Sequence, residues 1–188
     1  IQTALNWSGY YKSEIDGLFG QGTRKSISEW QRENGLKVTG ILTKNQKQFL
    51  IATYNAPLRS LGLKTISDRS AGISVKLPLK LIEFKRYVFP LAHFESKNGN
   101  LPRIYLISKK GGAKSLSSLF KAIQTIDLIP RGGIHKFKQK SFEIFSENYK
   151  VIAYATARTS DEEIKGFILL WPNGDEDRRK RLLREMKN

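Results

Sequence analysis

Residues 9–23 read GYYKSEIDGLFGQGT, and this segment gives the N-terminal part of the chain its architecture. Asp16-Gly17 is typical of a tight turn, and Gly20 allows the chain to reverse direction close to a helix. The Asp16 carboxylate can accept backbone N–H bonds near a helix that begins at about Thr23. The segment therefore predicts a rigid loop between two helices.

Helical patterns lie on both sides of this loop. Ile1, Ala4 and Leu5 share one face of a short first helix. A second helix is predicted for about residues 23–34 and a third for about residues 43–54, because side chains there recur at helical spacing. The region is therefore expected to form a small three-helix bundle.

The core of this bundle is expected to be rich in aromatic side chains. Tyr11, Phe19 and Trp30 are large residues of a kind that small domains usually bury. Phe49 and Leu50 are predicted to point inward from the third helix. The glycines of the region leave a shallow groove beside the loop.

The turn and core residues of this region follow a specific order and spacing. They are Ile1-Gln2, Leu5, Gly9-Tyr10-Tyr11, Ile15-Asp16-Gly17, Phe19-Gly20, Thr23, Trp30-Gln31, Gly35-Leu36 and Thr39-Gly40. With this pattern, residues 1–55 resemble the three-helix peptidoglycan-binding domain that tethers many cell-wall hydrolases. Trp30 departs from it, since that family more often has phenylalanine there. The resemblance implies peptidoglycan as a partner and a bacterial protein of the periplasm or one that is secreted.

The groove beside the loop is the predicted ligand site. Amphipathic and polar side chains at its rim suit a sugar–peptide ligand that carries amides and carboxylates. The residues predicted to bind peptidoglycan are Tyr10, Asp16, Gln21, Arg24 and Gln31.

Residues 56–70 separate this region from a second domain. They begin with Ala56-Pro57 and mix polar and small residues without a helical or strand period, which is typical of a linker. The predicted organisation is therefore a peptidoglycan-binding domain at 1–55, a linker at 56–70 and a basic α/β domain at 71–188.

The second domain is predicted to contain strands and helices in the order βββαβββα. The strands are expected near residues 73–77, 87–95, 103–108, 142–146, 149–158 and 164–171, and the helices at 115–126 and 175–187. Such an order indicates a sheet covered by helices, which makes the whole chain an α+β protein of two domains. The order is similar to that of the PsbP and Mog1 type of sandwich. Residues 167–174, FILLWPNG, resemble the end of uncharacterised domains that follow wall-binding modules in bacterial envelope proteins.

The composition limits the kinds of partner and site that the chain can have. The formal net charge is +16, and most of the excess lies beyond residue 55, so an anionic partner is expected. The chain has no cysteine, which excludes thiolate nucleophiles and disulfides. It offers only His93 and His135 as imidazole ligands, so no metal or other cofactor is predicted. No apolar run is long enough to span a membrane.

Residues in the second domain that match catalytic motifs are explained by their positions in predicted helices and strands. Ser118 and Lys121 match a Ser-x-x-Lys motif, but they fit the solvent side of the predicted helix at 115–126. His93 and Glu95 form the one acid–base pair worth testing, although a strand edge is a sufficient explanation for both. No catalytic residue is therefore predicted.

Two clusters of basic residues fit a binding site for an anionic partner and a solvated surface equally well. They comprise Lys97, Lys109, Lys110, Lys114 and Lys121, and then His135, Lys136, Lys138 and Lys140 around Phe137. The leading hypothesis is a non-catalytic wall-binding protein whose second domain binds another envelope polyanion or a protein. One alternative is a peptidoglycan hydrolase with an unrecognised site. A third is a secreted polyanion or nucleic-acid binder, with nucleic acid the less favoured ligand.

Overall fold

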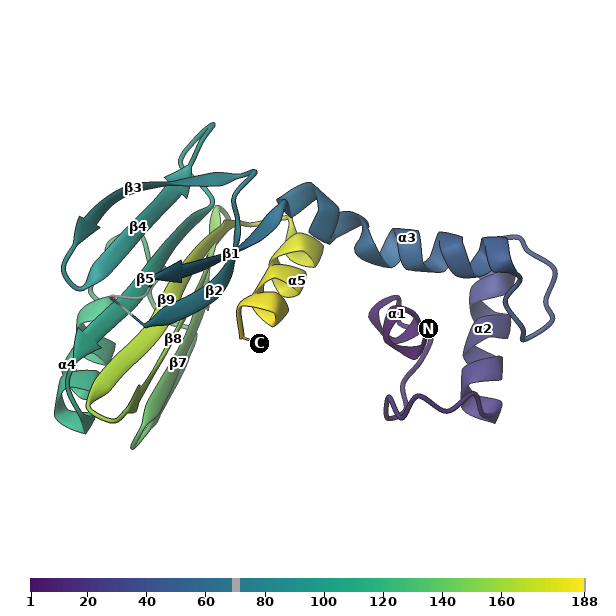
Figure 1. Cartoon of the computed structure of the whole chain (residues 1–188), viewed down its shortest axis with the longest axis horizontal. Helices are drawn as coiled ribbons and strands as arrows, with labels where there is room; N and C mark the ends of the chain where they lie inside the picture. Colours follow the sequence, from purple (N-terminus) through teal and green to yellow (C-terminus); the bar gives the residue numbers. More distant parts are fainter. Residues whose placement is uncertain (69–71, 188) are drawn as a thin grey trace. The chain divides into compact units, whose positions relative to one another are not determined.

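The chain divides into two compact units, residues 1–59 and 60–188. The computed structural model (Figure 1) describes residues 1–68 and 72–187. Helices form the first unit, whereas the second contains strands and helices, so the prediction of an α+β chain is confirmed.

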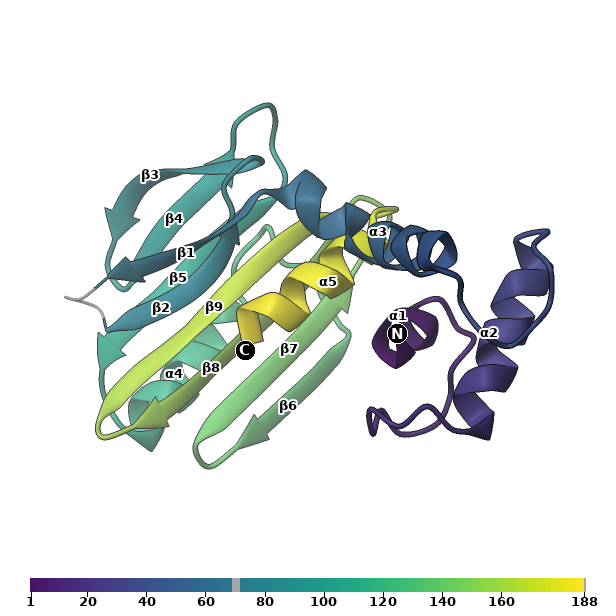
Figure 2. The ribbon, with the colours of Figure 1, turned by 45° about the vertical axis from the view of Figure 1, so that its right-hand side comes forward.

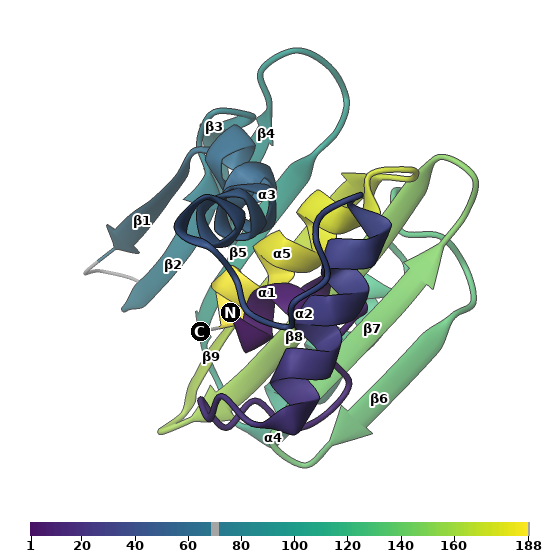
Figure 3. The same ribbon diagram turned by 90° about the vertical axis from the view of Figure 1, so that its right-hand side faces the viewer.

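The first unit contains α1 (Gln2–Trp7), α2 (Gln21–Glu33) and most of α3 (Lys44–Leu61). The predicted loop runs from the end of α1 to the start of α2, as Figure 3 shows. The buried apolar core of this unit consists of Ala4, Leu5, Tyr11, Ile27, Trp30 and Leu50.

Two aromatic residues expected in this core lie at the surface. The Phe19 side chain is 48% exposed, and the Arg24 guanidinium lies 5.4 Å from the centre of its ring. Phe49 is 52% exposed, with its ring centre 6.0 Å from that of Trp30. Leu50, its neighbour on α3, is buried as predicted. The predictions for Phe19 and Phe49 were therefore wrong, whereas that for Leu50 is confirmed.

The predicted linker at 56–70 has regular structure through most of its length. Helix α3 continues through Pro57 to Leu61, and β1 (Leu63–Asp68) follows directly. The Arg59 Nη2 atom donates to the Ala52 carbonyl oxygen at 3.0 Å, in the turn that precedes the proline. Pro57 cannot donate to the Thr53 carbonyl oxygen, but the helix continues past it for another turn. The prediction of an irregular linker was wrong.

The second unit is built on antiparallel strands. After β1 come β2 (Ile73–Pro78), β3 (Ile82–Val88), β4 (Leu91–Ser96), β5 (Arg103–Lys110), β6 (Ile134–Lys138), β7 (Ser141–Glu147), β8 (Val151–Ser160) and β9 (Glu163–Pro172). In the described part of the chain, β1 and β2 form a hairpin, and the others form a sheet of order β3-β4-β5-β9-β8-β7-β6.

The two remaining helices lie on opposite faces of this large sheet (Figure 2). Helix α4 (Ala113–Ile123) buries Leu116 and Ile123 against one face. Helix α5 (Glu176–Lys187) lies on the other face, where it also contacts β2 through an ion pair of 2.7 Å between Glu185 and Lys76. The central strand β9 is therefore covered on both faces, which explains its nearly continuous apolar sequence.

The order of strands differs from the predicted βββαβββα. The structure has β1 to β5 before α4 and β6 to β9 after it. The single strand predicted at 87–95 is in fact the turn and second half of the β3–β4 hairpin. Strand β6 is exposed at every position, so it carries no alternation of apolar and polar residues from which to predict it.

Candidate functional site

A groove of about 540 Å³ lies beside the N-terminal half of α2 in the first unit. One wall is the exposed surface of that helix, and the other is the turn at Thr39-Gly40. Its lining residues are Gln21, Gly22, Arg24, Lys25, Ser28, Thr39 and Gly40. Most of these side chains are polar and two are cationic, which suits a ligand with carboxylates, amides and hydroxyls.

Gln31 holds the second wall in place. Its side chain is completely buried, and its Oε1 atom accepts the backbone N–H groups of Thr39 at 2.8 Å and Gly40 at 3.0 Å. Its Nε2 atom donates to the carbonyl oxygen of Ile41 at 2.9 Å. One amide therefore fixes three consecutive residues of the turn against α2.

Gly40 is required where the turn meets the helix. Its φ of +69° is a conformation that side chains with a Cβ atom rarely adopt. A Cβ atom there would lie 3.1 Å from the Ser28 Oγ atom and 3.3 Å from the Arg24 carbonyl oxygen. The close approach of turn and helix gives the groove its narrow base.

A second buried amide, that of Gln2, organises the loop between α1 and α2. Its Nε2 atom lies 3.0 Å from the Tyr11 hydroxyl and 2.8 Å from Asp16 Oδ1. Its Oε1 atom accepts the backbone N–H of Gly17 at 2.8 Å. The hydrogen bond from Gln2, followed by that from the Leu18 backbone N–H, lowers the pKa of the Asp16 carboxyl. This loop is therefore held by polar contacts around one glutamine.

The same loop presents apolar side chains to solvent. Ile15, Leu18 and Phe19 are 45%, 69% and 48% exposed. Phe19 places its ring beside the Arg24 guanidinium, which lines the groove. An apolar surface therefore continues from one end of the polar groove.

The structure brings together two of the five residues predicted to bind peptidoglycan. Gln21 and Arg24 both line the groove. Tyr10 does not, because its hydroxyl donates to Glu33 Oε2 at 2.8 Å near the other end of α2. Asp16 is exposed but serves the loop, and Gln31 is buried, so both shape the site without lining it.

Five of the groove residues were not predicted to bind, and a sequence signal exists for two of them, Lys25 and Ser28. Gln21, Lys25 and Ser28 lie at intervals of four and three along α2, so they share one face of the helix. Extending the prediction from Gln21 along that face would have found Lys25 and Ser28. Gln2 was part of the motif, but its role depends on five contacts that no spacing reveals.

The acid–base pair of the second unit lies on β4. His93 Nδ1 and Glu95 Oε1 are 4.0 Å apart, and Arg86 Nη2 is also 4.0 Å from that oxygen. Both ring nitrogens of His93 lack a hydrogen-bond partner among the described residues. Burial, and after it the charge of Arg86, lowers the pKa of His93, whose ring packs against that of Tyr105.

Within residues 1–68 and 72–187, no three histidine, aspartate or glutamate side chains gather closely enough to hold a metal ion. Among the helices of those same residues, none has both the length and the apolar character needed to cross a membrane.

Comparison with known proteins places the N-terminal region in a family. Residues 1–50 match the model of the family described as "Putative peptidoglycan binding domain". Spore cortex-lytic enzymes are also similar: that of Bacillus cereus is 31% identical over 74 residues, which are 38% of this chain and 29% of the relative. That of Bacillus subtilis is 40% identical over 52 residues, which are 27% of this chain and 17% of the relative.

The chain thus spans less than a third of the length of these curated relatives. Among solved structures, a cyanobacterial PsbP from Synechocystis gives a TM-score of 0.43 at 14% identity, covering 66% of this chain and 89% of that one. The family match covers α1, α2, the groove and the start of α3. Residues 1–50 therefore form the peptidoglycan-binding domain that the N-terminal motif predicts.

Proposed function

We propose that this chain is a non-catalytic protein of the bacterial cell envelope that attaches to peptidoglycan through the groove on α2. The observation that carries the proposal is the position of this groove inside the segment that matches the peptidoglycan-binding family. The attached first unit would then keep the second unit at the cell wall, either in the periplasm or outside the cell.

The chemistry of the groove supports this ligand. Arg24 and Lys25 provide cations for the carboxylates of wall peptides. Gln21, Ser28 and Thr39 provide amide and hydroxyl groups for peptide bonds and sugar hydroxyls. The exposed ring of Phe19 next to Arg24 offers an apolar surface to the face of a sugar.

The first test is co-sedimentation of the full chain with purified peptidoglycan sacculi. Arg24→Gln should weaken binding about three- to tenfold, the loss of one charge-assisted hydrogen bond, while the melting temperature stays unchanged. Lys12→Gln is the matched control, because Lys12 is exposed and does not line the groove. Equal binding by Arg24→Gln and wild-type protein would contradict the proposed site.

A second candidate function is wall hydrolysis, favoured by the names of the spore cortex-lytic relatives. His93 and Glu95 would be its acid–base pair, although neither lines the groove or the larger cavity of the second unit. Release of dye from labelled sacculi separates the two functions. No release by the full chain supports a binding protein, whereas release that Glu95→Gln abolishes would establish an enzyme.

A further inference from the structure

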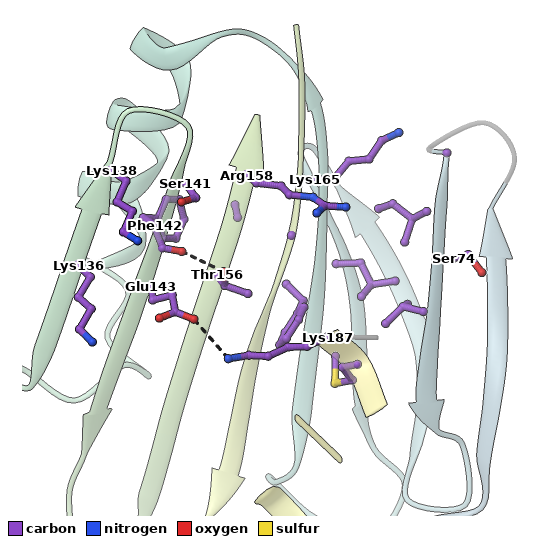
Figure 4. Close-up of a pocket in the computed structure, with 18 residues that line it drawn as sticks. Ser74, Lys136, Lys138, Ser141, Phe142, Glu143, Thr156, Arg158, Lys165 and Lys187 are labelled. Atoms are coloured by element: carbon purple, nitrogen blue, oxygen red, sulfur yellow. Dashed lines mark hydrogen bonds and ion pairs between the residues drawn. The ribbon is translucent and has the colours of Figure 1, made fainter. Parts of the chain in front are cut away.

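Three cations and one hydroxyl form a row across four strands of the large sheet. Lys138 on β6 pairs with Ser141 on β7, Ser141 pairs with Arg158 on β8, and Arg158 pairs with Lys165 on β9. Residues paired in this way have side chains on the same face of a sheet. Figure 4 shows these four side chains along one border of a cavity. We call them the basic row.

Two of the three cations of the basic row have no carboxylate partner among the described residues. Among the described residues, neither Lys138 nor Arg158 has an ion-pair partner, and Arg158 lies directly opposite Lys165. Like charges in directly opposed positions destabilise a pair of strands. Lys165 has one carboxylate at 2.6 Å, that of the half-exposed Glu163. The row therefore keeps a concentrated positive charge that folding alone does not require.

Glu143 is the one carboxylate among the described residues that line this cavity, and it is already engaged. It lies opposite Lys136, accepts a hydrogen bond from the Tyr154 hydroxyl, and is 3.3 Å from Lys187 Nζ. The hydrogen bond from Tyr154 is the largest cause that lowers the pKa of Glu143, and Lys187 adds to it. Because its charge is compensated locally, Glu143 leaves the basic row free to attract an anion.

The cavity beside the row has a volume of about 650 Å³, which is enough for a small organic molecule. It lies against the face of the sheet that α5 occupies, with β2 on its other side. Its apolar wall is formed by Ile73, Val75, Leu106, Phe167 and Met186. A ligand that fills it must therefore combine an anionic group with an organic part.

We propose that this cavity binds a phosphate ester. The Arg158 guanidinium can hold two phosphate oxygens as a fork, and Lys138 and Lys165 add point charges on either side. The Ser141 hydroxyl, between Lys138 and Arg158 in the row, can donate to another oxygen. A phosphate uses all four groups, whereas a single carboxylate has two oxygens only. The organic substituent packs on the apolar wall.

Calorimetric titration of the full chain tests this site with hexyl phosphate, glycerol 3-phosphate, inorganic phosphate and polyglycerol phosphate. Hexanol and duplex DNA are the comparison ligands. The variant Lys138→Gln/Arg158→Gln should bind hexyl phosphate at least about tenfold more weakly than the wild type. Arg158→Lys keeps the charge but removes the two-pronged guanidinium, so its affinity for hexyl phosphate should fall about threefold. Lys114→Gln/Lys121→Gln removes the same charge from α4 on the opposite face, and should change affinity less than about twofold.

The probes distinguish the source of the ester. Tighter binding of hexyl phosphate than of inorganic phosphate supports a small ester seated on the apolar wall. Tight binding of polyglycerol phosphate that the basic-row variant removes supports a phosphodiester polymer. Equal losses in the basic-row and α4 variants would overturn the site in favour of general polyanion binding. Binding of hexyl phosphate no tighter than that of hexanol, or weaker than that of duplex DNA, would also overturn it.

Discussion

The groove of the first unit and the cavity of the second are shaped by different kinds of structure. Two buried amides, Gln2 and Gln31, hold the loops around the groove in the first unit. The cavity of the second unit lies on a sheet whose backbone ladder fixes every position, and its charged side chains Lys138 and Arg158 are exposed. In the first unit, the residues that stabilise the fold therefore also shape the site. In the second unit, the charged residues of the site can be changed without disturbing the fold.

The size of the two cores explains this difference. The first unit buries few apolar side chains, so its loops need specific hydrogen bonds to stay in one conformation. In the second unit, α4 covers one face of the sheet, and α5, which also contacts β2, lies on the other. Substitutions at buried polar positions of the first unit should therefore lower the free energy of unfolding more than substitutions in the basic row of the second unit.

The largest effect is expected for Gln31→Leu, which keeps the size of the side chain but removes its polar atoms. The backbone N–H groups of Thr39 and Gly40 lose their acceptor, at a cost of about 2–4 kcal/mol in the free energy of unfolding. Because the turn is a wall of the groove, binding to sacculi should fall as well. Denaturant unfolding and co-sedimentation of the full chain measure both effects.

Gln48→Leu is the control for this prediction. Gln48 is an exposed glutamine on α3, so the same change there should alter stability by less than about 0.5 kcal/mol. Equal stabilities of the two variants would show that the turn at Thr39-Gly40 does not depend on the buried amide.

In the second unit, the corresponding large effect should come from an added methyl group. Gly166 on β9 lies between Ile107 and Ala157, and a Cβ atom there would overlap the backbone of Thr156 and Ala157. Gly166→Ala should lower the free energy of unfolding by about 1–3 kcal/mol, as overpacking of a core does. Thermal unfolding measures it, with Gly99→Ala as the control because nothing lies near that position. An unchanged stability of Gly166→Ala would mean that β8 and β9 can move apart to accept the methyl group.

The sequence predicted the first unit well because its turns are encoded locally. Asp16-Gly17 and the start of α2 follow from residue types whose backbone preferences are strong. The extension of α3 through Pro57 could not be predicted, because the residue before a proline usually marks the end of a helix. In the second unit, β6 escaped because an exposed edge strand needs no apolar pattern.

The candidate sites were predicted less completely than the fold. Gln21 and Arg24 were predicted because polar side chains at the rim of a groove suit a sugar–peptide ligand, and both line the groove. Gln31 was assigned to the ligand although it is buried, since the sequence shows its polarity but not its partners. The basic row was hidden for a related reason, because Lys138, Arg158 and Lys165 become neighbours only through strand pairing.

A smaller effect is expected from pH at the loop of the first unit. The pKa of Asp16 lies below its ordinary value of 3.8 in the folded protein, because Gln2 and the Leu18 N–H bind the carboxylate. Its contribution to stability is therefore present above about pH 4 and is lost as the pH falls through the lowered pKa. Asp16→Asn should be less stable than the wild type at about pH 6, and the difference should shrink as the pH falls through the lowered pKa of Asp16.

Glu14→Gln is the control for Asp16→Asn. Its carboxylate is exposed two residues earlier in the loop, and the substitution changes the charge by the same amount without touching Gln2. Melting temperatures across the acid range compare the two variants. A difference for Asp16→Asn that stays constant down to pH 2 would show that the charge of Asp16 does not hold the loop.

The smallest effect should have the opposite sign. Arg158→Gln removes one of two like charges that face each other across β8 and β9, so it should stabilise the free protein by about 0.2–1 kcal/mol at low ionic strength. High salt screens the repulsion and should abolish this gain. Thermal unfolding in the two salt conditions measures it, with Lys121→Gln as the matched loss of charge. Destabilisation by Arg158→Gln would mean that the basic row serves the fold, whereas stabilisation with weaker phosphate binding means that its charge serves a ligand.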